Sequence, residues 1–183
     1  MNKILLTAAV IVATSFTLCA QNNKDMKTSK TLVAYFSATG TTAQVAKDIA
    51  DLTGGTLYEI APKSAYTSAD LDWNNKQSRS SVEMNDPQAR PELKTTATDL
   101  STYDTIFIGY PIWWNLAPRI INTFIESHNL KGKTLIPFAT SGGSGVNNSV
   151  NELKKTYPDL KWKDGKLLNR TNKNALQQWI NQL

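Results

Sequence analysis

The feature that most constrains this chain is a regular alternation of short apolar runs with helix-like repeats. Three runs, Leu32–Phe36, Thr105–Tyr110 and Thr134–Ala139, contain no charged residue. Uncharged runs of this length between helical patterns are typical of strands buried on both faces of a parallel sheet. The alternation therefore predicts an α/β fold, a doubly wound five-stranded parallel sheet with helices on both faces.

Apolar residues at helical spacing follow each of these runs. The first helix is expected to end at a pair of glycines, and proline opens the second and closes the third. The expected helices are Ala43–Thr53, one from Pro118 through Ile125, Val146–Tyr157 and Leu176–Leu183.

Two further strands are predicted from weaker patterns. The period-two alternation at Thr56–Ile60 favours a half-covered or edge strand, and Leu160–Leu168 must supply a short fifth strand. Pro137 lacks an amide donor, which argues against a central place for its strand.

Residues 62–100 form a connection that is long for a compact domain. A helix over Ala69–Met84, capped by Thr67 or Ser68, would shorten it. Arg79 and Glu83 then lie one turn apart, and we interpret them as a solvated ion pair.

The first residues differ in character from the rest. Residues 1–20 begin with a short basic segment followed by an uncharged stretch, Ile4–Leu18, that is too short to span a membrane comfortably. We interpret them as a secretory signal peptide cleaved after Ala20. Residues 21–29 are then a polar tether, 30–183 are the folded domain, and the protein is expected to be exported to the periplasm. Lipidation at Cys19 is the alternative, although Leu18 fits a lipoprotein signal poorly.

Composition excludes several classes of function. Cys19 is the only cysteine and His128 the only histidine, so the folded domain has no disulfide, no thiolate nucleophile and no multi-histidine metal site. The net charge is +5 and the pI about 9.3. Because the basic residues are scattered, we expect no nucleic-acid binding, and membrane contact only through a lipid at Cys19. Acidic partners are favoured over basic ones.

The loops that leave the carboxyl ends of the three buried strands are the place for a ligand in such a sheet. The first loop combines hydroxyl groups and glycine with the start of a helix and has no charge, which predicts a phosphate site built from neutral donors. The alternative is that its side chains only cap the helix. The loop residues are Ser37, Thr39, Gly40, Thr41 and Thr42.

The other two loops have different chemistry. Adjacent tryptophans in the second favour a flat conjugated ligand, although one of them is expected to belong to the core. Glycines in the third let backbone approach a ligand closely. The second loop is Pro111-Ile112-Trp113-Trp114-Asn115, and the third is Ser141-Gly142-Gly143-Ser144-Gly145.

One phosphate, one flat ring and one tight backbone loop describe flavin mononucleotide (FMN). On these loops the chain resembles the flavodoxin-like family, from Lys30 to Leu183, and residues 66–91 look like the long connection of one of its branches. The resemblance implies strand order 2-1-3-4-5, bound FMN and electron transfer. Carried over, the first loop holds the phosphate, the second lines one face and edge of the ring, and the third lines the pyrimidine edge.

Two departures from the family pattern bear on function. Thr41 stands where flavodoxins often have asparagine, and the chain is basic where electron carriers are typically acidic. We also expect Asn115 to tolerate positive φ and to let the Trp114–Asn115 peptide turn toward a reduced flavin.

Three functions are therefore considered. The first is an exported electron-transfer protein whose partner is a redox protein with an acidic surface or a small electron acceptor. The second is an FMN-dependent reductase that takes hydride from NAD(P)H and passes it to quinones or flavins. The third is a domain that binds FMN or another ligand without redox work.

Overall fold

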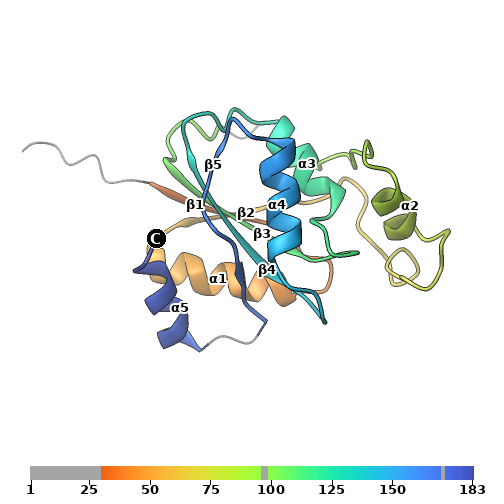
Figure 1. Ribbon diagram of the computed structural model, residues 1–183, viewed down its shortest axis with the longest axis horizontal. Coiled ribbons are helices and arrows are strands. Elements are labelled where there is room, and N and C mark those ends of the chain that lie inside the picture. Colours follow the sequence, from red (N-terminus) through yellow and green to blue (C-terminus); the bar gives the residue numbers. More distant parts are fainter. Residues whose placement is uncertain (1–29, 96–98, 170–171) are drawn as a thin grey trace, which may run out of the picture.

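A computed structural model describes residues 30–95, 99–169 and 172–183. The expected signal peptide and tether, and Cys19 with them, lie outside the described residues. Parallel strands form one sheet in the order β2-β1-β3-β4-β5, and a short strand β6 also pairs with β4. The predicted order 2-1-3-4-5 is thereby confirmed, with β2 at one edge (Figure 1).

The strands follow the apolar runs closely. β3 and β4 are buried along almost their whole length, whereas the edge strand β2 is largely exposed. The strands are β1 (Thr31–Tyr35), β2 (Thr56–Glu59), β3 (Thr105–Pro111), β4 (Thr134–Thr140), β5 (Lys161–Trp162) and β6 (Lys166–Leu167).

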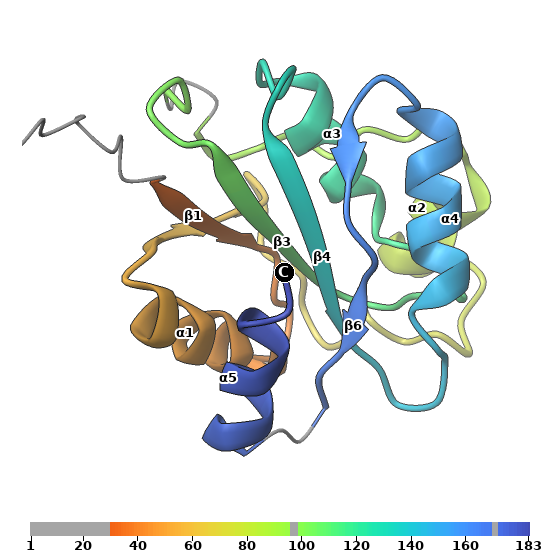
Figure 2. The same ribbon diagram turned by 60° about the vertical axis from the view of Figure 1, so that its left-hand side comes forward.

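The helices cover both faces of the sheet. Apolar residues of α1 and α5 pack on one face around Val33 and Phe107, and those of α3 and α4 pack on the other around Leu32 and Ile108 (Figure 2). The helices are α1 (Thr41–Thr53), α2 (Arg79–Asn85), α3 (Arg119–Glu126), α4 (Asn147–Thr156) and α5 (Lys173–Ile180). The predicted α/β fold with two helical layers is confirmed.

Pro137 lies in the interior strand β4, and the fifth strand is divided opposite it. The carbonyls of Leu135 and Ala139 accept hydrogen bonds from Lys163 and Leu168, at 2.8 Å each. Since alternate residues of a strand face the same neighbour, Pro137 also faces β5 and β6, where it has no donor to offer. The single strand predicted at 160–168 is therefore two short ones.

The connection 62–100 is mostly irregular, and the helix predicted over 69–84 is wrong for its first half. Among the described residues of the connection, only those of α2 form a helix, and Ser78 caps it by accepting from the Ser81 amide. Before α2, short polar side chains accept hydrogen bonds from backbone amides two residues further on. Asp72 accepts from the Asn74 amide, and Asn75 accepts from the Gln77 amide. Such bonds compete with helical ones, so the chain turns instead. Figure 1 shows α2 past the carboxyl ends of the strands.

Within the described ranges, no helix is long and apolar enough to cross a membrane. No group of three or more histidine, cysteine, aspartate or glutamate side chains placed to hold a metal occurs there either.

Candidate cofactor site

The three predicted loops meet at the carboxyl edge of the sheet, because β1, β3 and β4 are adjacent. The Ile112 amide donates to the Thr140 carbonyl at 2.8 Å, which joins the second loop to the end of β4. The hydroxyls of Thr42 and Thr140 lie 2.9 Å apart, which joins the first loop to the same place. A cavity of about 540 Å³ lies between the loops. Its lining is Thr39, Thr41, Pro111, Ile112, Trp113, Thr140, Ser141, Gly142 and Asn169.

The first loop leaves the start of α1 uncapped by side chains. Gly40 adopts φ +89° at the N-cap, and its amide donates to Ser37 Oγ at 3.1 Å. Among the described residues, no acceptor bonds the amides of Thr41, Thr42 or Ala43. The alternative that the loop side chains merely cap the helix is therefore not what the structure shows. Three amide donors and the positive helix end face the loop, as a phosphate requires.

The second loop contains a tight turn in an unusual conformation. Amides and carbonyls of Trp113 and Leu116 bond each other in both directions, at 3.0 and 2.9 Å. Between them Trp114 and Asn115 have φ of +47° and +63°, which together define a type I′ turn. The left-handed region suits asparagine, but a bulky aromatic residue rarely adopts it. Strain of this kind concentrates at functional sites.

This turn argues against the expected rotation of the Trp114–Asn115 peptide. Rotating the central peptide of a type I′ turn converts it to type II′, whose first central position is dominated by glycine. Here that position is Trp114. The turn is held further by Asn148 of α4, whose side-chain amide donates to the Asn115 carbonyl at 3.0 Å.

The two tryptophans of the second loop differ in burial. Trp113 is half-buried, with its ring 5.5 Å from that of Phe36 and 5.2 Å from that of Tyr66 in edge-on contacts. Trp114 is 44% exposed and lines a second cavity, described below. One tryptophan thus packs on the core, and the other is available to a ligand.

Arg79 and Glu83 form an ion pair near Trp113. The sequence predicted that this pair would be solvated, but it is mostly buried. Arg79 Nε and Glu83 Oε1 are 2.6 Å apart, and their side chains are only 26% and 14% exposed. The Arg79 guanidinium lies 4.0 Å from the centre of the Tyr66 ring, and the Tyr66 hydroxyl donates to Glu83. Burial, and next the bond to Glu83, raise the pKa of Tyr66. The pair therefore supports the aromatic cluster that holds the second loop.

The third loop is fixed at its start and open along its glycines. Ser141 and Asn169 are joined by two bonds of 2.7 Å, from the Ser141 amide to Asn169 Oδ1 and from Asn169 Nδ2 to the Ser141 carbonyl. Ser141 Oγ in turn accepts from the amides of Gly143 and Ser144. A Cβ on any loop glycine (Gly142, Gly143 or Gly145) would meet no atom within 4 Å, and none of the three has positive φ. Neither packing nor backbone conformation demands these glycines, and without side chains the loop backbone is open to close approach by a ligand.

Sequence reasoning missed Asn169 and Asn148. Asn169 directly follows the predicted fifth strand, so the carboxyl-end rule that selected the other loops would have found it. Asn148 lies on an exposed helical turn and carries no comparable signal.

A second cavity, of about 420 Å³, adjoins the first across the second loop. Residues of the long connection form one wall of this cavity, and residues of the first and second loops form the other. Its lining is Ala38, Thr39, Leu71, Trp73, Ser80, Pro111, Ile112, Trp113 and Trp114.

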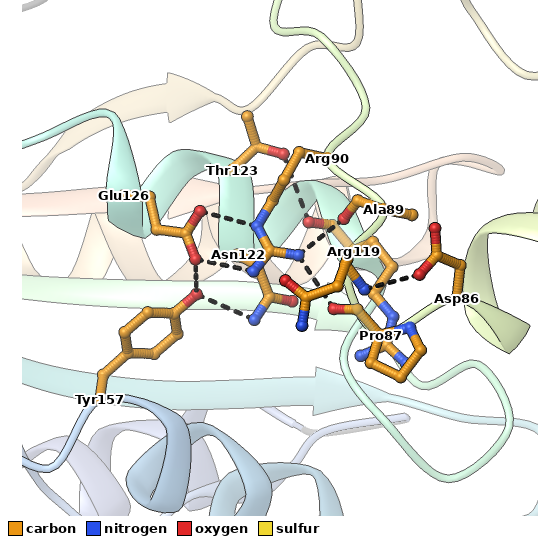
Figure 3. A network of polar contacts seen from close by, with 10 residues as sticks. Asp86, Pro87, Ala89, Arg90, Arg119, Asn122, Thr123, Glu126 and Tyr157 are labelled. Atoms are coloured by element: carbon orange, nitrogen blue, oxygen red, sulfur yellow. Dashed lines mark hydrogen bonds and ion pairs between the residues drawn. The ribbon is translucent and has the colours of Figure 1, made fainter.

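A polar network ties the end of the connection to the helical layer (Figure 3). Arg90 binds both carboxylate oxygens of Glu126, with Nε–Oε2 and Nη2–Oε1 distances of 2.7 and 2.9 Å, and also the Pro87 and Ala89 carbonyls. The Tyr157 hydroxyl donates to Glu126 at 2.7 Å. The bond from Arg90 holds the pKa of Glu126 below its usual value. This anchor fixes one end of the connection that walls the second cavity.

Fold and site together define a doubly wound α/β protein with a three-loop site at the carboxyl edge of its sheet, where uncharged loops surround free backbone amides. The sequence profile described as Flavodoxin matches residues 30–183, and the chain belongs to that family. Among curated protein sequences no significant match is found.

Solved structures of similar chains agree with this assignment. A protein designated a flavoprotein from Bacteroides eggerthii DSM 20697 is 67% identical, with a TM-score of 0.82 over 84% of this chain and 96% of that one. One from Bacteroides uniformis ATCC 8492 is 59% identical, with a TM-score of 0.82 over 84% and 98%. A flavoprotein in complex with FMN from Lactobacillus acidophilus NCFM is 22% identical, with a TM-score of 0.65 over 83% and 99%. This last likeness shows the common fold.

Proposed function

We propose that the chain binds FMN at the three-loop site and works as an exported electron-transfer protein. The observation that carries the proposal is the set of three uncapped amides at the start of α1, beside a glycine loop that packing does not explain. FMN binding by the Lactobacillus flavoprotein of the same fold supports it.

The residues present fit FMN. Amides of Thr41, Thr42 and Ala43 would hold the phosphate, assisted by the hydroxyls of Ser37, Thr39 and Thr41. The second loop would line one ring face, and the third would line the pyrimidine edge through its backbone. The hydroxyl of Thr42 is already engaged with Thr140, so this residue contributes only its amide. When bound, FMN supplies one- or two-electron chemistry with proton uptake at the ring.

The phosphate assignment can be tested with a pair of matched glycine variants. Gly40 and Gly132 both have positive φ, +89° and +81°, and both have open space beside Cα. Alanine at either position costs about 1–2 kcal/mol of conformational strain. Gly40→Ala should lower both stability and FMN affinity, whereas Gly132→Ala, in the turn before β4, should lower stability alone. Equal FMN affinity in the two variants would contradict the assignment.

Redox work is tested on the protein with FMN bound. An absorption spectrum followed through dithionite reduction and reoxidation shows whether the bound flavin cycles reversibly. If the protein loses FMN on reduction, or if no acceptor reoxidises it, the electron-transfer role is contradicted. The protein would then be a domain that binds FMN without a redox function.

The charge of the chain guides the choice of partner. A net charge of +5 favours a redox protein with an acidic surface, or a small electron acceptor. The rate of electron transfer to an acidic partner should then fall as ionic strength rises. An increase in that rate with salt would contradict an acidic docking surface.

Export is part of the same proposal. Mass spectrometry of the protein recovered from a Gram-negative host should give a chain that begins at Gln21. A chain that begins at a lipid-bearing Cys19 would establish membrane anchoring instead, and Cys19→Ala should then abolish it. A chain that still begins at Met1 would contradict export.

The second candidate is an FMN-dependent NAD(P)H reductase. It is favoured by one observation, the cavity of about 420 Å³ next to the three-loop site, with Trp73 in its wall. Steady oxidation of NAD(P)H by the FMN-loaded protein, in the presence of a quinone, decides between reductase and carrier.

A further inference from the structure

A third cavity, of about 310 Å³, lies between the end of the long connection and the helices α3 and α4. None of the described residues that line it belongs to the three loops of the cofactor site. Its volume is at the lower end of the range for small-molecule sites, which is about 300–1,000 Å³. The cavity is therefore large enough for a ligand of its own.

Two arginines line this cavity, and their guanidiniums differ in bonding. Arg90 binds Glu126 through Nε and Nη2, and two backbone carbonyls through Nη1 (Figure 3). Arg119 donates a single hydrogen bond, from Nη2 to the Met84 carbonyl at 3.1 Å. Arg119 forms no ion pair with any residue that the structure describes. One guanidinium of the wall is thus satisfied, and the other lacks a counter-ion.

The nitrogen atoms of Arg119 show where a ligand can bind. Nε has no partner among the described residues, but it is buried and out of reach of a ligand. Nη1 has no partner there either, and it is not buried, so it is open to the cavity that Arg119 lines. Burial, and next the charge of Arg90, lower the pKa of Arg119, and the carboxylates of Asp86 and Glu152 do not outweigh these effects. An anion at Nη1 would supply both an acceptor and the missing counter-charge.

The rest of the wall indicates what kind of anion fits. Pro87, Leu116 and Leu153 offer apolar contacts for a short hydrocarbon body. Glu152 lies in the same wall, and its carboxylate would repel a second negative charge on the ligand. The wall therefore favours a monoanion with a small apolar body over phosphate or a dicarboxylate.

We propose that this cavity binds a small organic monocarboxylate. Its carboxylate accepts a hydrogen bond from Arg119 Nη1, and its apolar part contacts Leu116 and Leu153. Leu116 also closes the turn of the second loop, so the ligand contacts the segment that shapes the cofactor site. The inference goes beyond the proposed function and does not rest on it, because no cofactor-loop residue lines the cavity.

The test compares benzoate with benzamide, which has the same ring and nearly the same size but no charge. Two-dimensional amide NMR spectra of the protein, with and without FMN, are recorded while each probe is added. Benzoate should shift the amide signals of Leu116, Ala117 and Asn122. Benzamide should bind about tenfold more weakly or less, because it cannot form the charge-assisted bond.

Three variants separate the guanidinium from general charge effects. Arg119→Met should weaken benzoate binding about tenfold or more and leave benzamide binding unchanged. Lys131→Met is the matched control, because it removes the same charge from an exposed residue in the turn before β4 and should leave benzoate binding unchanged. Glu152→Gln alters a half-exposed side chain, should retain the fold, and should strengthen benzoate binding about two- to fivefold by removing a like charge. This variant keeps the test decisive if Arg119→Met does not fold.

Several results would overturn the inference. They are benzoate that shifts no amide signal at this cavity, benzamide that binds as tightly as benzoate, equal benzoate affinity in Arg119→Met and Lys131→Met, and no gain in affinity in Glu152→Gln. Failure of the proposed function would appear differently, as a protein that does not bind FMN but still binds benzoate at this cavity.

Discussion

Replacing Asn115 with valine tests whether the left-handed turn shapes the cofactor site. Asn115 is exposed and has φ +63°, so the substitution removes little packing and acts mainly through the backbone. Asparagine tolerates this region, whereas most other residues that have a Cβ are destabilised there by about 1–2 kcal/mol. The upper part of that range applies to valine, because it is β-branched.

The strain can lower either the free energy of unfolding or the affinity for FMN. Two backbone bonds between Trp113 and Leu116, and a third bond from Asn148, hold the turn. If these bonds keep its shape, the free energy of unfolding falls by about 1–2 kcal/mol. If the turn changes shape instead, FMN must restore it on binding, and its dissociation constant rises about 5- to 30-fold.

The assay is therefore urea unfolding of the protein without FMN, together with titration of FMN. The two free-energy losses should add up to about 1–2 kcal/mol. Asn115→Gly is the control, because glycine adopts positive φ freely and should retain FMN affinity while changing stability by no more than about 1 kcal/mol. A valine variant that matches the wild type in both assays would refute the reasoning.

Three further predictions concern the sheet, the anchor and the third loop. An alanine Cβ at Gly109 would lie 2.1 Å from Cζ of Phe138, so Gly109→Ala should lower the calorimetric free energy of unfolding by about 1–3 kcal/mol, and adding Phe138→Leu should recover part of it. The lowered pKa of Glu126 beside Arg90 means that this carboxylate stabilises the fold above its unfolded pKa of about 4.3, and that the contribution is lost as pH falls through the folded value. Glu126→Gln should thus show a smaller loss of stability to urea between about pH 5 and pH 3 than the wild type. Asn169→Ala releases the start of the third loop, and FMN affinity in a fluorescence titration should fall about three- to tenfold, whereas unchanged affinity would exclude a role for this clamp.

Much of the fold follows from local pattern. Uncharged runs buried on both faces, separated by helical repeats, leave a parallel doubly wound sheet as the consistent arrangement, and loops at carboxyl ends then meet. The first helix ends at Gly54 because this residue adopts positive φ, which its sequence position already indicated. The first part of the expected helix over 69–84 does not form, for an equally local reason, since short polar side chains there bond nearby amides.

Other features depend on which distant segments become neighbours. The missing donor of Pro137 is a property of the sequence, but the break in the fifth strand follows only because that side of β4 faces β5 and β6. The solvent exposure of Arg79 and Glu83 likewise could not be inferred from their spacing, because Tyr66 covers them only once the connection has folded back.

The sequence by itself determined the main strands, the three loops and their chemistry, because periodicity, turn residues and helix starts are encoded within a few neighbouring positions. The strand order was implied by the resemblance of the loops to those of a known family. Tertiary structure decided which distant side chains contact and hold those loops. It brought Asn148 and Asn169 to the loop backbones. Such contacts join residues far apart in the chain, and their geometry exists only when the sheet and its connections have packed.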